Sequence, residues 1–232
     1  MKYYIQNTPK IKLKHDANDR ASIIVVLAVY LSPIVLFPFN IKNEDVIIFI
    51  ECIYYVLSLF VAEYVIFKER KKNFRCFKKR WKQYVRLFVN SVLHCITLQI
   101  VLCIITSKIS KGVSENQASV SKMPLVVLLI MALGYAPVVE EVVFRYVLRR
   151  LIKKDVLYIV ISGLVFGLVH VLSSIGMHSV LDVFAYSLPH FGVGLYLAYV
   201  YASTNSIETC IIIHRGLNLF ASIPLILLSI IL

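Results

Sequence analysis

Residues 124–150 read PLVVLLIMALGYAPVVEEVVFRYVLRR, a mostly apolar run that nevertheless contains Glu140, Glu141 and Arg145. A bilayer core about 30 Å thick is crossed by roughly 20 helical residues, so the run is long enough to form a transmembrane helix. Ionisable side chains inside a bilayer cost about 2.5–3.5 kcal/mol each on insertion scales. The stretch therefore predicts a membrane span whose charged residues need partners or a function.

The rest of the chain has the same apolar character. Of its 232 residues, 59% are hydrophobic and 16% are charged, against about 45–50% and 25% in soluble domains. Six further apolar runs have the length of membrane spans, at residues 21–39, 46–67, 87–107, 156–177, 183–202 and 207–232. We expect an all-α fold, a polytopic transmembrane helix bundle of about seven spans with almost no soluble part.

The charge distribution indicates the topology. Residues 68–86 hold ten Lys or Arg, and basic loops between spans stay in the cytoplasm. By alternation the N-terminus should be cytoplasmic and the C-terminus outside. Residues 1–20 contain no continuous apolar stretch and do not resemble a signal peptide, so the first helix should remain as an anchor.

The net charge of +12 follows from this topology, because the basic residues lie between the apolar runs. We therefore exclude nucleic acid as a partner. A surface for anionic lipid on the basic loop is the alternative interpretation of the same charges.

Polar content divides the chain into two parts. Residues 1–120 comprise the N-terminal tail and three scaffold transmembrane helices joined through the basic cytoplasmic loop at 68–86. Residues 121–232 form four spans that hold nearly all the polar groups of functional interest. Five scattered cysteines without CxxC spacing indicate neither a disulfide framework nor a thiolate metal site. We expect the second part to carry the function.

Helical spacing distinguishes the two glutamates within residues 124–150. Residues four apart lie on one helix face, so Glu141 can pair with Arg145. Glu140 is turned about 100° away from Glu141 and has no cation on its own helix. Glu140 is thus the freer of the two carboxylates.

Two later spans carry further pairs at the same spacing, Phe166 with His170 and His214 with Asn218. Together with Glu140 they can form one polar pocket, with a carboxylate and imidazole to deprotonate water and donors to stabilise an oxyanion. The same residue types serve in proton-coupled transporters, and a single buried histidine is often structural. Residue chemistry alone leaves hydrolysis and transport both open.

The order of these motifs resembles the CPBP (CAAX-processing and bacteriocin-processing) family, also called the Abi or type II CAAX endopeptidase family of intramembrane proteases. The resemblance rests on Glu-Glu-x-x-x-Arg, then Phe-x-x-x-His, then His-x-x-x-Asn on the last span, and it covers residues 125–219. The linking segments 191–196 and 204–207 are also similar to the family pattern. Each motif is weak alone, and the three in order are specific.

The resemblance implies an intramembrane peptidase, with a role for each motif residue. Glu140 would act as general base on the attacking water and His170 would help to hold that water. Glu141 and Arg145 would support the Glu140 carboxylate.

His214 and Asn218 would stabilise the tetrahedral oxyanion. Participation of a metal is disputed for the family, and we favour a metal-free glutamate mechanism with no cofactor. A zinc ion, if present, would be bound by Glu140, His170 and His214, a set that suits Zn²⁺.

The resemblance implies a membrane-associated peptide or protein as the substrate, with a role in bacteriocin immunity or peptide maturation. A non-catalytic peptide-binding immunity protein on the same fold is the main alternative. Richness in Ile, Lys and Asn favours a low-GC bacterial source, hence a multi-pass protein of the bacterial plasma membrane.

Four structural expectations accompany these roles. Gly134 and Pro137 should break the span before the glutamates. Gly163 and Gly167, four apart, predict a close helix contact. His190 has no place in the motifs; a helix-packing hydrogen bond is its expected role, and substrate contact is the alternative. Ideal perpendicular helices would put the site histidine and glutamate of the first two motifs at different depths, so tilted or bent helices are required.

Overall fold

The computed structural model describes residues 17–36 and 44–231, and these residues form an all-helical bundle. The N-terminal tail through residue 16, and residues 37–39 of the first expected span, lie outside the described residues. The α-helices are α2 (Ala17–Leu36), α3 (Glu44–Ile109), α4 (Glu115–Ser121), α5 (Leu125–Leu129), α6 (Ala136–Glu141), α7 (Leu148–Leu151), α8 (Asp155–Val169), α9 (Val180–Thr204) and α10 (Ile207–Ile231). Two π-helical turns, η1 (Ile130–Tyr135) and η2 (Val142–Val147), and a 3₁₀ turn, η3 (Leu172–Ser174), complete the described elements.

Five stretches of the described helices are long and apolar enough to cross a membrane. They are Phe49–Phe67, Phe77–Ile109, Leu125–Leu151, Val180–Thr204 and Ile207–Leu227. Two shorter apolar helices, Ile23–Ser32 and Asp155–Val169, lie among them. The all-helical, multi-pass membrane fold is confirmed, whereas the number of seven spans and the cytoplasmic N-terminus stay predictions.

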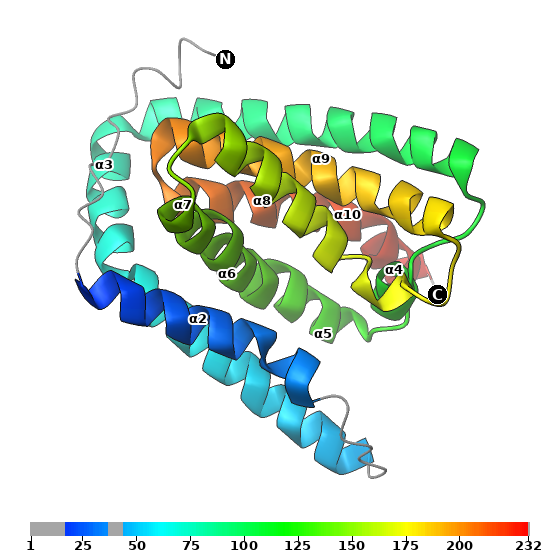
Figure 1. Ribbon diagram of the computed structural model, residues 1–232. Helices are drawn as coiled ribbons and strands as arrows, with labels where there is room; N and C mark the ends of the chain where they lie inside the picture. Colours follow the sequence, from blue (N-terminus) through cyan, green and yellow to red (C-terminus); the bar gives the residue numbers. More distant parts are fainter. Residues whose placement is uncertain (1–16, 37–43, 232) are drawn as a thin grey trace.

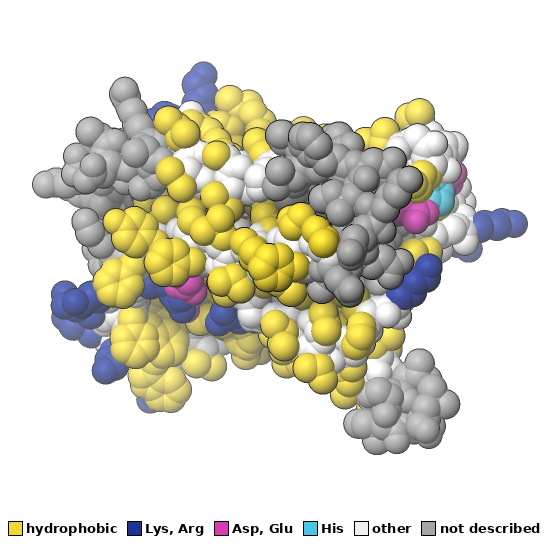
Figure 2. All heavy atoms as spheres, turned by 90° about the horizontal axis from the view of Figure 1, so that it is seen from below, with side chains coloured by type: hydrophobic (Ala, Val, Ile, Leu, Met, Phe, Trp, Pro, Cys, Tyr) yellow, Lys and Arg dark blue, Asp and Glu magenta, His cyan; other side chains and the backbone are white. Residues whose placement is uncertain are grey.

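The bundle has the surface of a protein surrounded by lipid. Hydrophobic side chains cover the middle of the face in Figure 2, and Lys and Arg gather toward its ends. Val126, Phe60 and Val156 on three of these helices are 69%, 69% and 76% exposed. Soluble monomers rarely expose such continuous apolar surface, so the exposed faces are those that hydrocarbon would cover.

The basic segment 68–86 is helical, which corrects the prediction of a loop there. Element α3 contains spans two and three and the segment between them, and it consists of two helices that meet at a kink at Arg80 (φ −135°, ψ 29°). Residues 44–109 contain no Gly or Pro to stop the helix, and Lys, Arg and Glu are good helix formers. In Figure 1 α3 turns around one end of the bundle, so that its first part lies beside α2 and its last part beside α9.

The fourth predicted span is a continuous helix from Leu125 to Leu151 that contains both π turns. The expected break before the glutamates takes the form of η1, which contains Gly134 and ends two residues before Pro137. Each π turn inserts one extra residue into the helix, and such turns recur at functional sites. Here they bracket α6, which ends with Glu140 and Glu141.

One backbone carbonyl is left unpaired within η1 and is satisfied from another helix. Ala136 N donates to Met131 O, five residues back, so the Ala132 carbonyl loses its α-helical partner. The next residue able to replace that partner is Pro137, which has no N–H. The Asn218 amide of α10 donates to Ala132 O at 2.8 Å.

Helix α8 is shorter than the apolar run that predicted it. The expected span continued to residue 177, but α8 ends at Val169 with His170 as its C-cap, and η3 follows. Ser173, Ser174 and Gly176, which adopts φ +86°, disfavour continuation of the helix. At 1.5 Å per residue, α8 is only about 22 Å long.

Glycines bring α8 and α9 into close contact, as Gly163 and Gly167 predict. A Cβ at Gly163 would lie 2.7 Å from Leu195 Cγ, and one at Gly167 would lie 3.1 Å from Ser187 O. Gly194 of α9 is equally crowded, because its Cβ would lie 3.0 Å from Gly163 Cα. Backbones that approach so closely hold α9 at a fixed position along α8.

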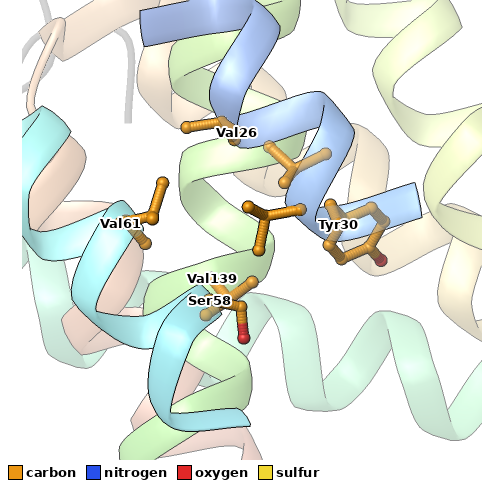
Figure 3. A pocket seen from close by; sticks show the side chains of 8 residues that line it. Val26, Tyr30, Ser58, Val61 and Val139 are labelled. Carbon is orange, nitrogen blue, oxygen red and sulfur yellow. The ribbon is translucent and has the colours of Figure 1, made fainter. Parts of the chain in front are cut away.

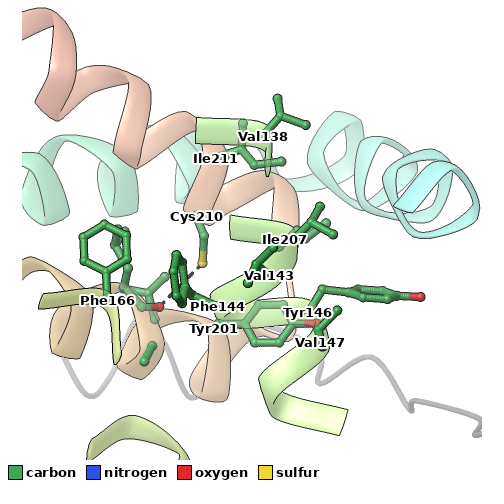
Figure 4. Packing of buried hydrophobic residues seen from close by; sticks show 14 of the residues in the cluster. Val138, Val143, Phe144, Tyr146, Val147, Phe166, Tyr201, Ile207, Cys210 and Ile211 are labelled. Carbon is green, nitrogen blue, oxygen red and sulfur yellow. Dashed lines mark hydrogen bonds between the residues drawn. The ribbon is translucent and has the colours of Figure 1, made fainter. Parts of the chain in front are cut away.

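The apolar core fills the space between these helices. Figure 4 shows Phe144, Phe166 and Tyr201 packed near Cys210, whose thiol donates to Leu197 O at 3.6 Å. Phe166 stands edge-on to Phe144, with ring centroids 5.2 Å apart. The core therefore continues up to the helix faces that carry the polar motifs.

We predict that Gly194→Ala lowers the free energy of unfolding by about 1–3 kcal/mol, because the added methyl group would overpack the α8–α9 contact. Gly134→Ala is the matched control, since a Cβ there meets nothing within 4 Å. Unfolding in mixed detergent micelles, followed by circular dichroism, measures both variants. Equal stability of the two would show that the α8–α9 contact can relax.

Candidate active site

Three helices bring the predicted carboxylate and two predicted imidazoles to one point. Glu140 Oε2 lies 3.7 Å from His170 Nε2 and 3.9 Å from His214 Nε2. This oxygen is buried and has no hydrogen-bond partner among the described residues. The helices thus meet as the motifs require, despite the different depths expected for ideal straight helices.

Glu141, unlike Glu140, has a cationic partner, and its predicted pairing with Arg145 is confirmed. Glu141 Oε2 lies 3.0 Å from Arg145 Nε, and both side chains are 0% exposed. Arg145 also donates from Nη1 to Ser162 Oγ at 2.7 Å, and Ser162 donates to the Phe144 carbonyl at 2.8 Å. The buried cation and carboxylate neutralise each other and are held from two helices.

The second oxygen of Glu141 orients His214. His214 Nδ1 lies 2.9 Å from Glu141 Oε1. An ionised carboxylate only accepts hydrogen bonds, so Nδ1 must carry the proton of this contact. His214 is thereby fixed with Nε2 toward Glu140, as a carboxylate orients the histidine of a hydrolytic triad.

His170 is fixed by its own helix. Its Nδ1 lies 2.8 Å from the carbonyl of Phe166, one turn earlier. A carbonyl also only accepts, so Nδ1 carries hydrogen and Nε2 of the neutral ring is an acceptor. Glu140 Oε2 and His170 Nε2 are therefore two acceptors that face each other.

The separation of these two acceptors suits a water molecule. At 3.7 Å it is too long for a direct hydrogen bond and short enough for one water to reach both atoms. Such a water would donate one hydrogen to Glu140 and the other to His170. Its lone pairs would then be free to attack an electrophile.

Asn218 of α10 is bonded to the backbone of the helix that bears Glu140. Its Nδ2 donates to Ala132 O in η1, on the part of the helix before Glu140. It lies one helical turn beyond His214, about 6 Å along α10. This contact gives Asn218 a role in holding η1, and its expected role as an oxyanion donor stays a prediction.

Phe166 connects the polar groups through its ring. The Arg145 guanidinium carbon lies 5.0 Å from the Phe166 centroid, and the His214 ring stands edge-on at 6.0 Å. The His170 ring lies 4.4 Å away, tilted by 36°. The motif phenylalanine therefore packs against all three of these side chains.

Two residues at the site were not predicted from the sequence. Ser162 accepts a hydrogen bond from Arg145. Its position could have been recognised from the sequence, because Ser162, Phe166 and His170 are spaced four residues apart on one face of α8. His190 was expected to make a helix-packing hydrogen bond, and it makes none with the described residues. Its ring instead stacks on His170, with centroids 4.3 Å apart and planes at 18°.

The candidate zinc ligands Glu140, His170 and His214 lie slightly farther apart than donors around a bound zinc ion. Among the described residues, no three His, Cys, Asp or Glu side chains are grouped to hold a metal ion. Donors at about 2.0–2.1 Å from a tetrahedral zinc lie roughly 3.3 Å apart, whereas Glu140 Oε2 is 3.7 and 3.9 Å from the two imidazole nitrogens. No catalytic step is therefore derived through a metal.

A small cavity lies beside the site, between α2, α3 and the Leu125–Leu151 helix (Figure 3). It is lined mainly by apolar side chains, with Tyr30 and Ser58 as the polar ones. Val139 and Val143 form its wall on the helix that bears Glu140. The cavity therefore adjoins the flank of the helix that bears Glu140.

These features define a multi-pass membrane protein with a carboxylate–imidazole site buried between its helices. Residues 122–220 match the family model described as Type II CAAX prenyl endopeptidase Rce1-like. The match confirms the resemblance of this part of the chain to the CPBP family. Searches of curated proteins and of solved structures found no significant match.

We predict that Arg145→Met destabilises the protein by about 3–5 kcal/mol, because it leaves the Glu141 carboxylate buried without a cation. Arg149→Met is the matched control, four residues on, where the partner Asp155 is 53% exposed. The control breaks an ion pair with an exposed carboxylate, which costs no more than about 1 kcal/mol, and the hydrogen bonds from Arg149 to the Ile152 and Lys153 carbonyls, but it leaves no carboxylate buried without a cation. Thermal unfolding in detergent distinguishes the two, and similar losses would contradict the importance of the buried pair.

The contact between Asn218 and Ala132 can be tested by a double-mutant cycle. Asn218→Ala should cost about 1 kcal/mol in the wild type, because it leaves the Ala132 carbonyl unpaired. Pro137→Ala restores an N–H to the helix, so the same change should cost less in that background. Unfolding free energies of the four proteins measure the coupling, and its absence would separate Asn218 from η1.

Proposed function

We propose that the protein is a glutamate-type intramembrane endopeptidase, with Glu140 as its general base. The observation that carries this proposal is the position of one buried Glu140 oxygen opposite the Nε2 atoms of His170 and His214. The family match to type II CAAX prenyl endopeptidases supports peptide-bond hydrolysis as the reaction.

The first step is attack by water held between Glu140 and His170. Glu140 removes a proton from this water as its oxygen bonds to the carbonyl carbon of the scissile peptide. The carbonyl π electrons move to oxygen and form an oxyanion. His170, whose Nδ1 is bound to the Phe166 carbonyl, accepts the second hydrogen bond of the water at Nε2.

The second step is collapse of the tetrahedral intermediate. His214 faces the reaction space with Nε2 and, when its ring is protonated, donates to the oxyanion. The carbon–nitrogen bond breaks, and the leaving nitrogen takes the proton from Glu140. Glu141 and Arg145 hold the His214 ring during both steps and do not exchange protons with the substrate.

The substrate we propose is a peptide or protein segment that lies in the membrane, because the site is enclosed by spans whose outer faces are apolar. Peptide maturation or bacteriocin immunity in a bacterial plasma membrane would supply such segments. The exposed basic part of α3 is suited to contact anionic lipid headgroups.

Comparative peptidomics of membranes carrying wild type or Glu140→Gln tests the activity and identifies the substrate. We expect products that depend on the wild type to fall by about 10²–10⁴-fold in the variant, the usual loss when a general base is removed. Glu51→Gln is the matched control, because Glu51 is also a glutamate on a membrane-spanning helix and belongs to none of the motifs.

The rival functions predict other results. A peptide-binding immunity protein would retain full protection of its host with Glu140→Gln at normal abundance, and no peptide would change. A proton-coupled transporter would move substrate across proteoliposomes without hydrolysing it. Either result would exclude the peptidase.

A further inference from the structure

We infer that His190 is a positioning residue for the reaction, because its imidazole supports the plane of His170. This inference rests on the proposed function, in which His170 Nε2 binds the attacking water. None of the three sequence motifs includes His190. It enters the site from α9, whereas the motif residues come from the Leu125–Leu151 helix, α8 and α10.

The contact is a ring stack of short range. The His170 and His190 centroids are 4.3 Å apart and the ring planes differ by 18°. Stacked aromatic rings have centroids about 4.5–7 Å apart, so the two imidazoles form a close, nearly parallel stack. His190 makes no hydrogen bond with the described residues, so the stack is its direct connection with the site.

The helices fix this contact by two independent constraints. Gly167 abuts Phe191 and Ser187 on α9, on both sides of His190 in the sequence, with a Cβ at Gly167 placed 3.1 Å from Phe191 N. His170 lies three residues after Gly167. The glycine contact therefore sets both the separation and the relative height of the two imidazoles.

Pro189 supplies the second constraint. Its missing N–H leaves the Ala185 carbonyl without a partner in α9. The Thr106 hydroxyl of α3 donates to that carbonyl at 2.8 Å. The helical turn that carries His190 is thus attached to α3 as well as to α8.

His170 needs such support, because one hydrogen bond does not fix a ring. The bond from Nδ1 to the Phe166 carbonyl determines which nitrogen carries hydrogen, but it allows rotation of the ring about that contact. The Phe166 ring is tilted by 36° and the His190 ring by 18°, so His190 is the more nearly parallel neighbour. It restricts the direction in which Nε2 points toward Glu140.

The test compares His190→Phe, which keeps a flat ring, with His190→Leu, which keeps apolar volume without one, and His190→Ala. We expect His190→Phe to retain product formation within about threefold, and the other two to lose about tenfold or more through misplacement of the water. Product accumulation is measured by the same membrane peptidomics. The ¹⁵N signals of the His170 side chain are measured in detergent micelles.

In His190→Leu and His190→Ala, the His170 side-chain signals should broaden or shift because the ring is free to rotate about its bond to the Phe166 carbonyl, while His190→Phe should keep the wild-type signals. A loss of product with unchanged His170 signals in all variants would assign His190 to substrate contact and overturn the inference. Wild-type behaviour of His190→Leu would also overturn it. If His190→Ala does not accumulate, the Phe and Leu variants decide.

Failure of the proposed function would give a different result from failure of the inference about His190. In that case Glu140→Gln leaves the peptide products unchanged, while the His170 signals still report whether His190 fixes the ring.

Discussion

The buried pair of Glu141 and Arg145 is the interaction on which the site depends. Both side chains are fully enclosed, and each compensates a charge that would otherwise oppose insertion of their helix into a membrane. The same carboxylate holds His214 through its second oxygen, and the same guanidinium is held by Ser162 of α8 and lies over Phe166. One ion pair thus connects three helices and leaves the neighbouring Glu140 with its buried oxygen directed toward two imidazoles.

Proline has a related structural effect in two of the spans. Pro137 and Pro189 each leave a carbonyl without a partner in a region where water cannot replace it. Asn218 satisfies one of these carbonyls and Thr106 satisfies the other, each from a different helix. The irregular backbone near the site therefore strengthens the association of helices, because each defect is repaired by a side chain of a neighbour.

Local spacing predicted the features that local geometry controls. The pairing of Glu141 with Arg145 and the close contact at Gly163 and Gly167 follow from residues four apart on a helix. The helical form of residues 68–86 in α3, the early end of α8 and the stack of His190 on His170 were not predicted, because hydropathy does not report how helices continue or turn. The contact of Asn218 depends on a π turn in another helix, and no spacing within α10 reveals it.

The π turn η1 has a consequence for comparisons between related sequences. A helix advances by about 100° per residue, so one inserted residue turns everything after it by that angle relative to everything before it. Residues 125–129 and the glutamates of α6 thus occupy faces that a regular helical wheel would misassign. Loss of one residue from η1 would preserve every motif. It would nevertheless rotate Glu140 relative to the start of the helix, and so turn it away from the histidines. The number of residues that a related sequence has across Ile130–Tyr135 is therefore as informative about the site as the presence of its glutamates.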